Sequence, residues 1–530
     1  MLPYPPYVAT ALESATIDKT AIESFLLPGA VLMENAARSV ARHALALFPT
    51  LREPGKRIII LAGPGQNGGD GWVLARLFHA LGHQVRGYLV AAPGAAPTGD
   101  AFPNYQTARL LNIPLSTISH EGDLLPAFNE ADFVIDALFG TGLAREIGDP
   151  QKRVLEALRD APRTFKVVAV DVPSGLCATT GALFGPAVAA DLTVSLGTYK
   201  AGLFSGNGPK LAGLVRLGDI GLSPPMLSPA PLGILLTKEY VSTLLPLRPR
   251  DGHKGTFGHA VVAGGSPGKT GALTLAALGA LRAGAGLVTA AHPKSFAAIF
   301  AQKLTAIMTL PLDESPGAAL GQSAADALLE FMGNKSALGL GCGMGLSESA
   351  ASCALTLAAR LPLPLVLDAD ALTLLAPSPR ALLSRAAPTV LTPHYGEAAR
   401  LLSVSSAEIA RDQLESSRQI ARERGAIVVL KGPRTIIARP DGRFFVNDSG
   451  SPILATGGSG DLLTGLITGL LAQKMDPFKA CALAVYAHGL AGEIAAEAKG
   501  PWGLSPWEIQ EFIPRAFQEL RDFGEKRQFL

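Results

Sequence analysis

Two glycine-rich turns place acidic and amide side chains beside backbone that can approach a ligand closely. The first, residues 63–71 (GPGQNGGDG), follows a strand-like run and opens into sequence of helical period. Its glycines let successive N–H groups approach a phosphate, and a helix start adds partial positive charge. An ordinary tight turn is the alternative, because Gln66, Asn67 and Asp70 interrupt the dinucleotide-binding fingerprint.

Aspartates also stand at the ends of two later strand-like runs. Asp136 opens the segment DALFGTGLARE, and Asp171 opens the turn DVPSG. Ligands of open parallel sheets bind beyond the carboxyl ends of the strands, so two such ends favour one shared site over separate turn residues. Oxygen-rich Asn67, Asp136 and Ser174 suit a hard cation, either an alkali ion or magnesium.

The second glycine-rich turn, residues 455–461 (ATGGSGD), runs directly into the apolar helical sequence LLTGLITGLLA. N–H groups at a helix N-terminus can hold phosphate oxygens. Asp461 in the first turn could simply stabilise the helix start. Beside an anion-binding turn, however, a carboxylate is the group needed to activate a hydroxyl for phosphoryl transfer.

Other polar residues have less specific surroundings. Asp368 and Asp370 are either neighbours of a metal or substrate, or turn residues at a strand end. His394 follows Thr-Pro at another strand end and is either a substrate contact or a surface residue. Tyr486 and His488 lie in a run of helical period, where a place in the core or on a helix surface is expected.

The elements that must position these residues alternate between strands and helices. Apolar runs of strand length are followed by helical spacing, such as that over residues 72–81, which predicts α/β domains with largely parallel sheets covered on both faces. We therefore expect domains at 1–222 and 235–530, joined by a proline-rich linker at 223–234. The predicted strands are 56–62, 132–136, 166–171 and 192–196, then 259–263, 287–291, 337–340, 365–368, 389–392 and 427–431.

The bulk composition excludes several classes of protein. Of the 530 residues, 17% are charged and the net charge is only +2, which gives no electrostatic reason to expect a nucleic acid or an anionic membrane as partner. Residues 271–291 are the most apolar stretch, but glycines and Arg282 break it, so we expect a helix and a strand rather than a membrane span. Scattered cysteines and the lack of a signal-peptide pattern predict a reduced cytoplasmic enzyme, and we expect a homo-oligomer.

Residues 10–222 resemble the NAD(P)H-hydrate epimerase family, with a Rossmann-like αβα sandwich as the implied fold. The resemblance rests on GPGQNGGDG, DALFGTGLARE, DVPSG, TVSLGTYKAGLFSG and the stretch from Leu26 to Ala37, with Gln66 where the family usually has asparagine. It implies that Asp171 is an acid/base for inversion at C6 and that potassium is bound by Asn67, Asp136 and Ser174. The implied hydrate contacts are Gln66, Asn67, Gly68, Gly69, Asp70, Gly140, Thr141, Gly142, Leu143, Ala144, Arg145, Glu146 and Asp171.

Residues 235–515 resemble the ribokinase-like ADP- or ATP-dependent NAD(P)H-hydrate dehydratases, again with an αβα sandwich. The motifs are HKGTFGH, GGS with Gly271-Ala272, GCGMG, DADAL, TPHYGE, KGPRT and the turn before Asp461. Cys342 stands where the family often has proline. The implied hydrate contacts are Ala272, Gly343, His394 and Asp461, and the implied nucleotide contacts are Lys431, Gly432, Pro433, Arg434, Thr435 and Gly460.

Together the two resemblances imply a bifunctional repair enzyme. The first activity would interconvert the R and S hydrates of NADH and NADPH at C6. The second would dehydrate the S form with ADP or ATP and magnesium, with Asp461 as base; ADP would yield AMP and phosphate. One alternative is a small-molecule kinase, making a phosphorylated hydroxymethylpyrimidine or sugar, fused to a nucleotide-binding domain. In another, the first domain is a non-catalytic binding or scaffold module.

Overall fold

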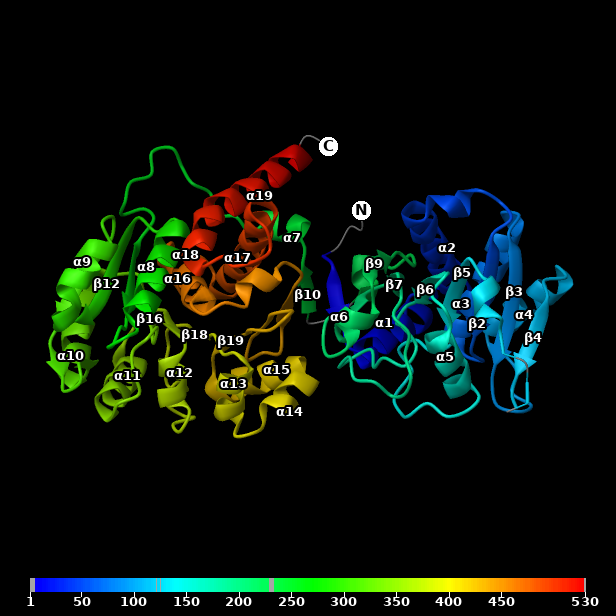
Figure 1. Cartoon of the computed structure of the whole chain (residues 1–530), viewed down its shortest axis with the longest axis horizontal. Helices are drawn as coiled ribbons and strands as arrows, with labels where there is room; N and C mark the ends of the chain where they lie inside the picture. The colour runs from blue at the N-terminus through cyan, green and yellow to red at the C-terminus, as the bar shows by residue number, and fades with distance from the viewer. Residues whose placement is uncertain (1–4, 121, 124, 228–232, 529–530) are drawn as a thin grey trace. The chain divides into compact units, whose positions relative to one another are not determined.

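The computed structural model describes residues 5–120, 122–123, 125–227 and 233–528. The chain divides into two compact units, Met1–Ile234 and Leu235–Leu530, and each contains a largely parallel sheet flanked by helices (Figure 1). This confirms the predicted α/β class. Of the expected linker, residues 228–232 lie outside the described residues, while Pro224–Leu227 form a 3-10 turn and β10 (Gly233–Leu236) begins within it.

The sheet of the first unit has the strand order β4-β3-β2-β5-β6-β7-β9, and every pairing in it is parallel. Their carboxyl ends therefore share one edge, as the sequence predicted for the motif-bearing strands. The strands are β2 (Arg57–Ala62), β3 (Gln84–Val90), β4 (Leu115–Ile118), β5 (Phe133–Ala137), β6 (Lys166–Val170), β7 (Leu192–Leu196) and β9 (Leu214–Gly218). The helices are α1 (Ala11–Glu23), α2 (Gly29–Leu47), α3 (Gln66–Ala80), α4 (Ala101–Leu110), α5 (Gln151–Asp160) and α6 (Gly208–Leu211).

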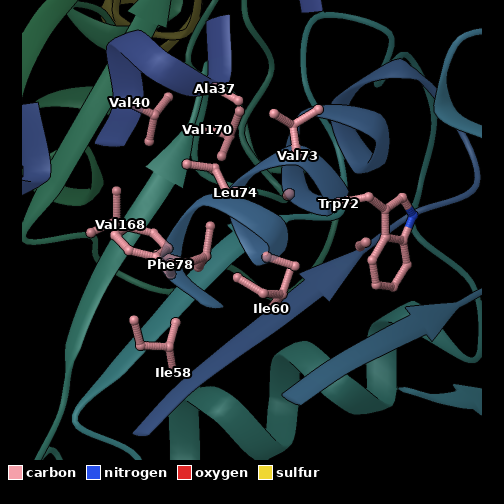
Figure 2. Close-up of a cluster of buried hydrophobic side chains, with 14 of the residues drawn as sticks. Ala37, Val40, Ile58, Ile60, Trp72, Val73, Leu74, Phe78, Val168 and Val170 are labelled. Atoms are coloured by element: carbon pink, nitrogen blue, oxygen red, sulfur yellow. The ribbon is translucent and has the colours of Figure 1, made fainter. Parts of the chain in front are cut away.

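Alternation along β2 divides the core of this unit between the two faces of the sheet. Ile58 and Ile60 pack with residues of α2 and α3, among them Trp72 and Phe78 (Figure 2). Ile59 instead joins the cluster formed with α5 on the opposite face. Since successive strand residues point to opposite faces, the apolar run of β2 is what a strand covered on both sides requires.

The N-terminal segment adds a strand and a helix that the sequence reading did not predict. β1 (Tyr7–Ala9) runs parallel to β8 (Tyr199–Lys200), with Ala9 opposite Lys200. The Thr10 side chain accepts from the Glu13 N–H and starts α1 through a capping box. This pairing fixes the start of α1 beside the segment that follows β7.

The sheet of the second unit runs in the order β13-β12-β11-β16-β17-β18-β19-β20-β21. Pairings are parallel from β13 to β19, and the β19–β20 and β20–β21 pairings are antiparallel. The strands are β11 (His259–Ala263), β12 (Leu287–Pro293), β13 (Met308–Leu312), β16 (Ala337–Leu340), β17 (Leu365–Leu367), β18 (Thr389–Leu391), β19 (Ile427–Leu430), β20 (Ile436–Ala438) and β21 (Phe444–Asn447), with a separate hairpin of β14 (Glu314–Ser315) and β15 (Ala319–Leu320).

Helices cover both faces of this second sheet: α11, α12 and α13 lie on one side, and α8, α16 and α17 on the other (Figure 1). The expected helix and strand within 271–291 are α8 and β12. The helices are α7 (Lys238–Ser242), α8 (Thr270–Arg282), α9 (Ala297–Lys303), α10 (Gln322–Phe331), α11 (Glu348–Arg360), α12 (Asp370–Leu375), α13 (Tyr395–Leu402), α14 (Ser406–Arg411), α15 (Gln413–Arg424), α16 (Ser459–Ala472), α17 (Pro477–Lys499), α18 (Pro506–Ile509) and α19 (Ile513–Gln528).

Helices α8 and α16 touch through their backbones. A Cβ on Gly465 would stand 1.9 Å from the Ala276 carbonyl oxygen, and one on Gly279 would stand 2.2 Å from that of Leu462. Only glycine permits this approach, because every other residue carries a Cβ. The apolar sequence after Asp461 is therefore a buried helix. None of the helices in the described parts of the chain has the length and apolarity needed to cross a membrane.

Candidate functional site

The first unit contains a cavity of about 560 Å³ at the carboxyl ends of β2, β5 and β6. Helices α1 and α2 form much of its remaining wall. The structure brings eight of the predicted hydrate contacts to this cavity: Gln66, Asn67, Asp70, Gly140, Thr141, Gly142, Leu143 and Asp171. Residues from the glycine-rich turn 63–71, from the loop that follows Asp136 and from the DVPSG turn thus meet at one site.

Five other predicted contacts do not line the cavity. Gly68 and Gly69 are buried in the first turn of α3, where a Cβ on Gly68 would lie 1.9 Å from the Gly63 carbonyl oxygen. These glycines permit a tight loop. Ala144, Arg145 and Glu146 are exposed in the described structure.

Asp171 is held in a defined position directly after β6. Its backbone is left-handed, with φ +69°, which is uncommon for a residue other than glycine. Its Oδ1 accepts from the Leu196 N–H at 2.9 Å and lies 2.6 Å from Lys200 Nζ. Lys200 is 1% exposed and also donates to the carbonyl oxygens of Leu196 and Thr198. Such a buried, charge-paired carboxylate next to a cavity is suited to proton transfer.

Two more carboxyl groups share this wall of the cavity. Burial, together with the charges of Asp171 and Asp18, raises the pKa of Asp70 against the opposing charge of Lys200. Desolvation, opposed by Lys200 and assisted by Asp171, raises the pKa of Asp18 to about 6. Sequence reasoning missed Asp18 because it did not predict α1. It also missed Lys200, although a lysine within the otherwise apolar TYKAGLF was a usable signal.

The predicted cation ligands lie at the same edge of the sheet. Asp136 accepts from the Ser174 hydroxyl at 2.6 Å and from the Ser174 N–H at 2.8 Å. Burial raises the pKa of Asp136, although the hydrogen bonds from Ser174 oppose that shift. The Asn67 amide lies against Gly140, and its buried Nδ2 has no hydrogen-bond partner among the described residues. Asp136 belongs to β5 itself, one residue before the strand ends.

In the second unit, side chains after several parallel strands converge on the start of α16. One ligand atom each from Cys342, Asp368 and Asp461 lies within 4.8 Å of the others. Asp368 also accepts from Lys431 Nζ at 2.8 Å and from Thr464 Oγ1 at 2.7 Å. Asp368 is therefore more than a simple turn residue: it pairs with the Lys431 ammonium and also offers one of three ligand atoms that a metal ion could use.

The charges around Asp461 and Lys431 shift the pKa values of both groups. Desolvation and the charge of Asp368 raise the pKa of Asp461 to about 6, against a hydrogen bond from Cys342 and the charge of Lys431. Burial alone would lower the pKa of Lys431, but Asp368 and Glu397 together raise it. Lys431 thus stays cationic, whereas Asp461 changes protonation state near neutral pH.

The glycine turn before Asp461 is shaped by one left-handed residue. Gly458 has φ +96° and precedes α16 without a side-chain cap, so the first N–H groups of the helix have no partner within it. Ser459 contacts His488 Nε2 at 3.3 Å. Burial and the charge of Lys431 lower the pKa of His488 to about 4, so this buried histidine on α17 is neutral.

The remaining predicted contacts are distributed more widely. Gly343 lies beside Ala272, because a Cβ added to Gly343 would stand 3.2 Å from the Ala272 Cβ. Gly460 lies beside Lys431, because a Cβ added to Gly460 would stand 3.1 Å from Lys431 Nζ. His394 caps α13, with Nδ1 accepting from the N–H groups of Gly396 and Glu397. Arg434 pairs with Asp448 at 2.6 Å. Of the three other predicted nucleotide contacts, Gly432 and Pro433 are exposed and Thr435 is half-buried.

Comparison with known proteins gives a consistent result for each half. The family described as YjeF-related protein N-terminus matches residues 29–202, and the family described as NAD(P)H-hydrate dehydratase matches residues 260–515. The chain is 40% identical to a bifunctional NAD(P)H-hydrate repair enzyme of Moorella thermoacetica, covering 97% of both chains. It is 35% identical to the enzyme of that name from Thermofilum pendens, again over 97% of each.

Among solved structures, the second unit is similar to an ADP/ATP-dependent NAD(P)H-hydrate dehydratase from Bacillus subtilis that was co-crystallised with ATP and Mg²⁺. The two are 30% identical, and the match covers 54% of this chain and 98% of that one with a TM-score of 0.48.

Proposed function

This chain belongs to the family of bifunctional NAD(P)H-hydrate repair enzymes, and on that premise we propose that Asp171 and Asp461 are the proton-transfer groups of its two active sites. It interconverts the R and S hydrates of NADH and NADPH and dehydrates the S form. The two activities belong together, because hydration at C6 creates a stereocentre and a dehydratase specific for one epimer leaves the other unrepaired.

We assign the epimerase reaction to the cavity of the first unit. Inversion at the hydroxylated C6 requires a bond at that carbon to break and re-form with transfer of a proton. Asp171 provides the proton acceptor because Lys200 and the Leu196 N–H stabilise its carboxylate beside the cavity. The first unit is in this proposal an enzyme and not a scaffold.

We further propose that Asn67, Asp136 and Ser174 hold a potassium ion. A carboxylate, a hydroxyl and an amide form the oxygen set that hard cations prefer. The geometry supports this fit, since the Asp136 carboxylate and the Ser174 hydroxyl lie 2.6 Å apart, and the Asn67 Oδ1, the amide atom that can bind a cation, lies against Gly140 in the loop after β5. When bound, potassium would supply positive charge at the edge of the cavity.

For the second unit, we propose phosphoryl transfer to the C6 hydroxyl. Asp461 takes the hydroxyl proton, the oxygen attacks the terminal phosphorus, and AMP leaves when ADP is the donor. The C6–O bond then breaks with its electron pair on phosphate, and loss of a proton from C5 completes the double bond of the reduced nicotinamide. Phosphate is a far better leaving group than hydroxide, which is why the donor is consumed.

The residues around Asp461 support this route. The start of α16 after Gly458 has no side-chain cap and can offer N–H groups to phosphate oxygens, and the half-buried Lys431 adds a positive charge. Lys431 to Thr435 and Gly460 are the proposed nucleotide contacts. Ala272, Gly343 and His394 are the proposed hydrate contacts. Magnesium, when present, would reduce the charge on the nucleotide phosphates, and Asp368 and Asp461 are carboxylates close enough to each other to help hold it.

The observation that carries the proposal for the second unit is the position of Asp461, immediately after an anion-binding turn and close to Asp368 and Lys431. Its test uses the full chain with both hydrate epimers, ADP and Mg²⁺, followed by the absorbance of reduced nicotinamide. Complete conversion with release of free phosphate is expected. A plateau near half would show an inactive first unit. A stable phosphorylated product would instead favour a small-molecule kinase.

Two coarser properties complete the proposal. We place the enzyme in the cytoplasm, where its NADH and NADPH substrates are used and where its four free cysteines would stay reduced. We also propose a homo-oligomer. The molar mass in solution, compared with the 54.8 kDa chain, tests that point.

A further inference from the structure

Helix α1 contributes one face to the epimerase cavity. Ser14, Asp18 and Ile22 line the cavity and recur every four residues, so they lie along one side of the helix. On its other side, Ile17 and Ala21 are buried against α2 and the segment after β9. Packing of that apolar side orients Asp18 toward the cavity.

The start of α1 is fixed by pairing near Lys200. Ala9 lies opposite Lys200 in the β1–β8 pair, and the Ala11 N–H donates to Thr179 Oγ1 at 3.0 Å. Since α1 begins at Ala11, a short and constrained segment connects the lysine that pairs with Asp171 to the helix that carries Asp18. Asp18 is therefore a positioned part of the cavity wall.

Five ionisable residues line this cavity: Asp18 and four others, whose surroundings differ from those of Asp18. Asp171 and Lys200 form a buried ion pair. Asp70 is buried, and its raised pKa favours the neutral acid. Asp100 is the N-terminal flanking residue of α4. Asp18 is exposed as a whole residue, and it lines the cavity without an ion-pair partner at contact distance among the described residues, so a hydrate bound in the cavity can reach its carboxyl.

We propose that Asp18 is a second catalytic residue of the epimerase, exchanging a proton with the C6 hydroxyl while Asp171 serves as its complement. This inference rests on the proposed assignment of the epimerase reaction to this cavity. Two carboxyl groups in opposite protonation states are the arrangement in which one gives a proton as the other takes one.

The proposed epimerisation proceeds by loss and re-addition of water at C6. The C6–O bond breaks with its electron pair on oxygen, which takes a proton from Asp18 and leaves as water, while the N1 lone pair forms a C6=N1 double bond. Water then adds to the other face of C6, N1 recovers its lone pair, and Asp171 takes the proton that the added water loses. The reverse reaction, or exchange with solvent, restores the starting protonation states.

The raised pKa of Asp18, about 6, supports this role because both protonation states are then populated near neutral pH. The main cause of the shift is burial of the carboxyl in the cavity wall, which raises its pKa; the charge of Lys200 opposes this effect, and the charge of Asp171 adds to it. An acid of this kind loses its proton, and the reaction its donor, as pH rises through that value.

The test follows conversion of pure R hydrate into S hydrate by the full chain, without nucleotide, across pH. Asp18→Asn should lower kcat on the order of 100-fold, the contribution of a general acid, with little change in KM. It should also lose the decline in rate above about pH 6. Asp18→Glu should retain part of the rate. Lys19→Gln, an exposed neighbour on the same helix, is the matched control and should behave as the original chain.

Each outcome decides the question. Unchanged kcat and pH dependence in Asp18→Asn would overturn the catalytic role, and so would an increase confined to KM, which would indicate a binding residue. If the original chain fails to interconvert the epimers, the epimerase assignment itself is wrong and this inference falls with it. ADP-dependent dehydration of the S hydrate by Asp18→Asn reports whether the variant protein is intact.

Discussion

Lys200 Nζ lies 2.6 Å from Asp171 Oδ1, and both side chains are almost completely removed from solvent. In a buried ion pair, the attraction between the two charges offsets the cost of removing both from water. Removing only one partner therefore destabilises the fold most, because the other charge stays buried without compensation. The pair therefore makes the proposed epimerase base also a point of structural sensitivity in the first unit.

Lys200→Met should abolish most epimerase activity and lower the free energy of unfolding of the first unit by about 3–5 kcal/mol, because Asp171 is left buried without its counter-charge. Denaturant unfolding and epimer interconversion measure the two effects. The double variant Lys200→Met/Asp171→Asn should recover much of the stability but none of the activity. Equal instability of the single and double variants would contradict the ion-pair explanation.

Asp461→Asn should reduce dehydratase kcat by about 10²- to 10⁴-fold, the usual contribution of a general base. Epimerisation by the same protein should be unchanged, which makes the first unit an internal control for folding. Phosphate release and the absorbance of reduced nicotinamide give the rate. Dehydration at the original rate would eliminate Asp461 as the base.

The dehydratase should lose activity as pH falls through about 6, since Asp461 must be ionised to accept a proton and its pKa is raised to that value. Cys342→Ala should move this acidic limb to higher pH, because the hydrogen bond from Cys342 lowers the pKa of Asp461. Cys342→Ser keeps a donor and should move the limb less. Identical pH–rate profiles for the three proteins would show that the thiol has no such influence.

Replacing potassium by tetramethylammonium should slow epimerisation and leave dehydration unaffected. Asp136→Asn should remove the difference between the two salts, because the proposed site loses its only carboxylate. Asp132→Asn, one position before the same strand and paired with Arg57 at 3.6 Å, is the surface control. A salt response that survives Asp136→Asn would place the potassium effect elsewhere.

His394 combines a cap on α13 with a proposed hydrate contact, and two substitutions separate these roles. His394→Ala should lower the free energy of unfolding by about 1 kcal/mol through loss of the cap, and should raise KM for the hydrate. Asn is a good N-cap residue, so His394→Asn should keep the stability. If KM is normal in His394→Asn, the ring serves only the helix.

The regular parts of both sheets were predictable because a parallel strand covered on both faces reads as an uninterrupted apolar run. Strands 192–196, 259–263 and 337–340 have the predicted bounds, and both glycine-rich turns precede helices as expected. The segment of α1 lacked such a signal, since Leu12 is 78% exposed and Ser14 is buried, so no clear apolar periodicity marks the helix.

The site was predictable as a set of loops but not as a set of contacts. Strand-end aspartates indicated where ligands would bind, because that follows from sheet topology. Which side chain would compensate each charge depends on tertiary packing. Lys200 pairs with Asp171, and Lys431 with Asp368, across long separations in sequence that carry no periodic pattern.

The backbone contact between α8 and α16 has a consequence for the spacing of the dehydratase site. Both helices begin at the dehydratase site: Ala272 lies in the first turn of α8, and Asp461 lies in the first turn of α16. The two helices run in the same direction and touch at Gly279 and Gly465. Because α8 and α16 are in direct backbone contact, a larger side chain at Gly279 or Gly465 would push the two helices apart. The distance between Ala272, a proposed hydrate contact, and Asp461, the proposed base, is therefore fixed by the fold before a ligand binds. Substitutions in the turn before Asp461 are compatible with this spacing only while Gly279 and Gly465 are kept.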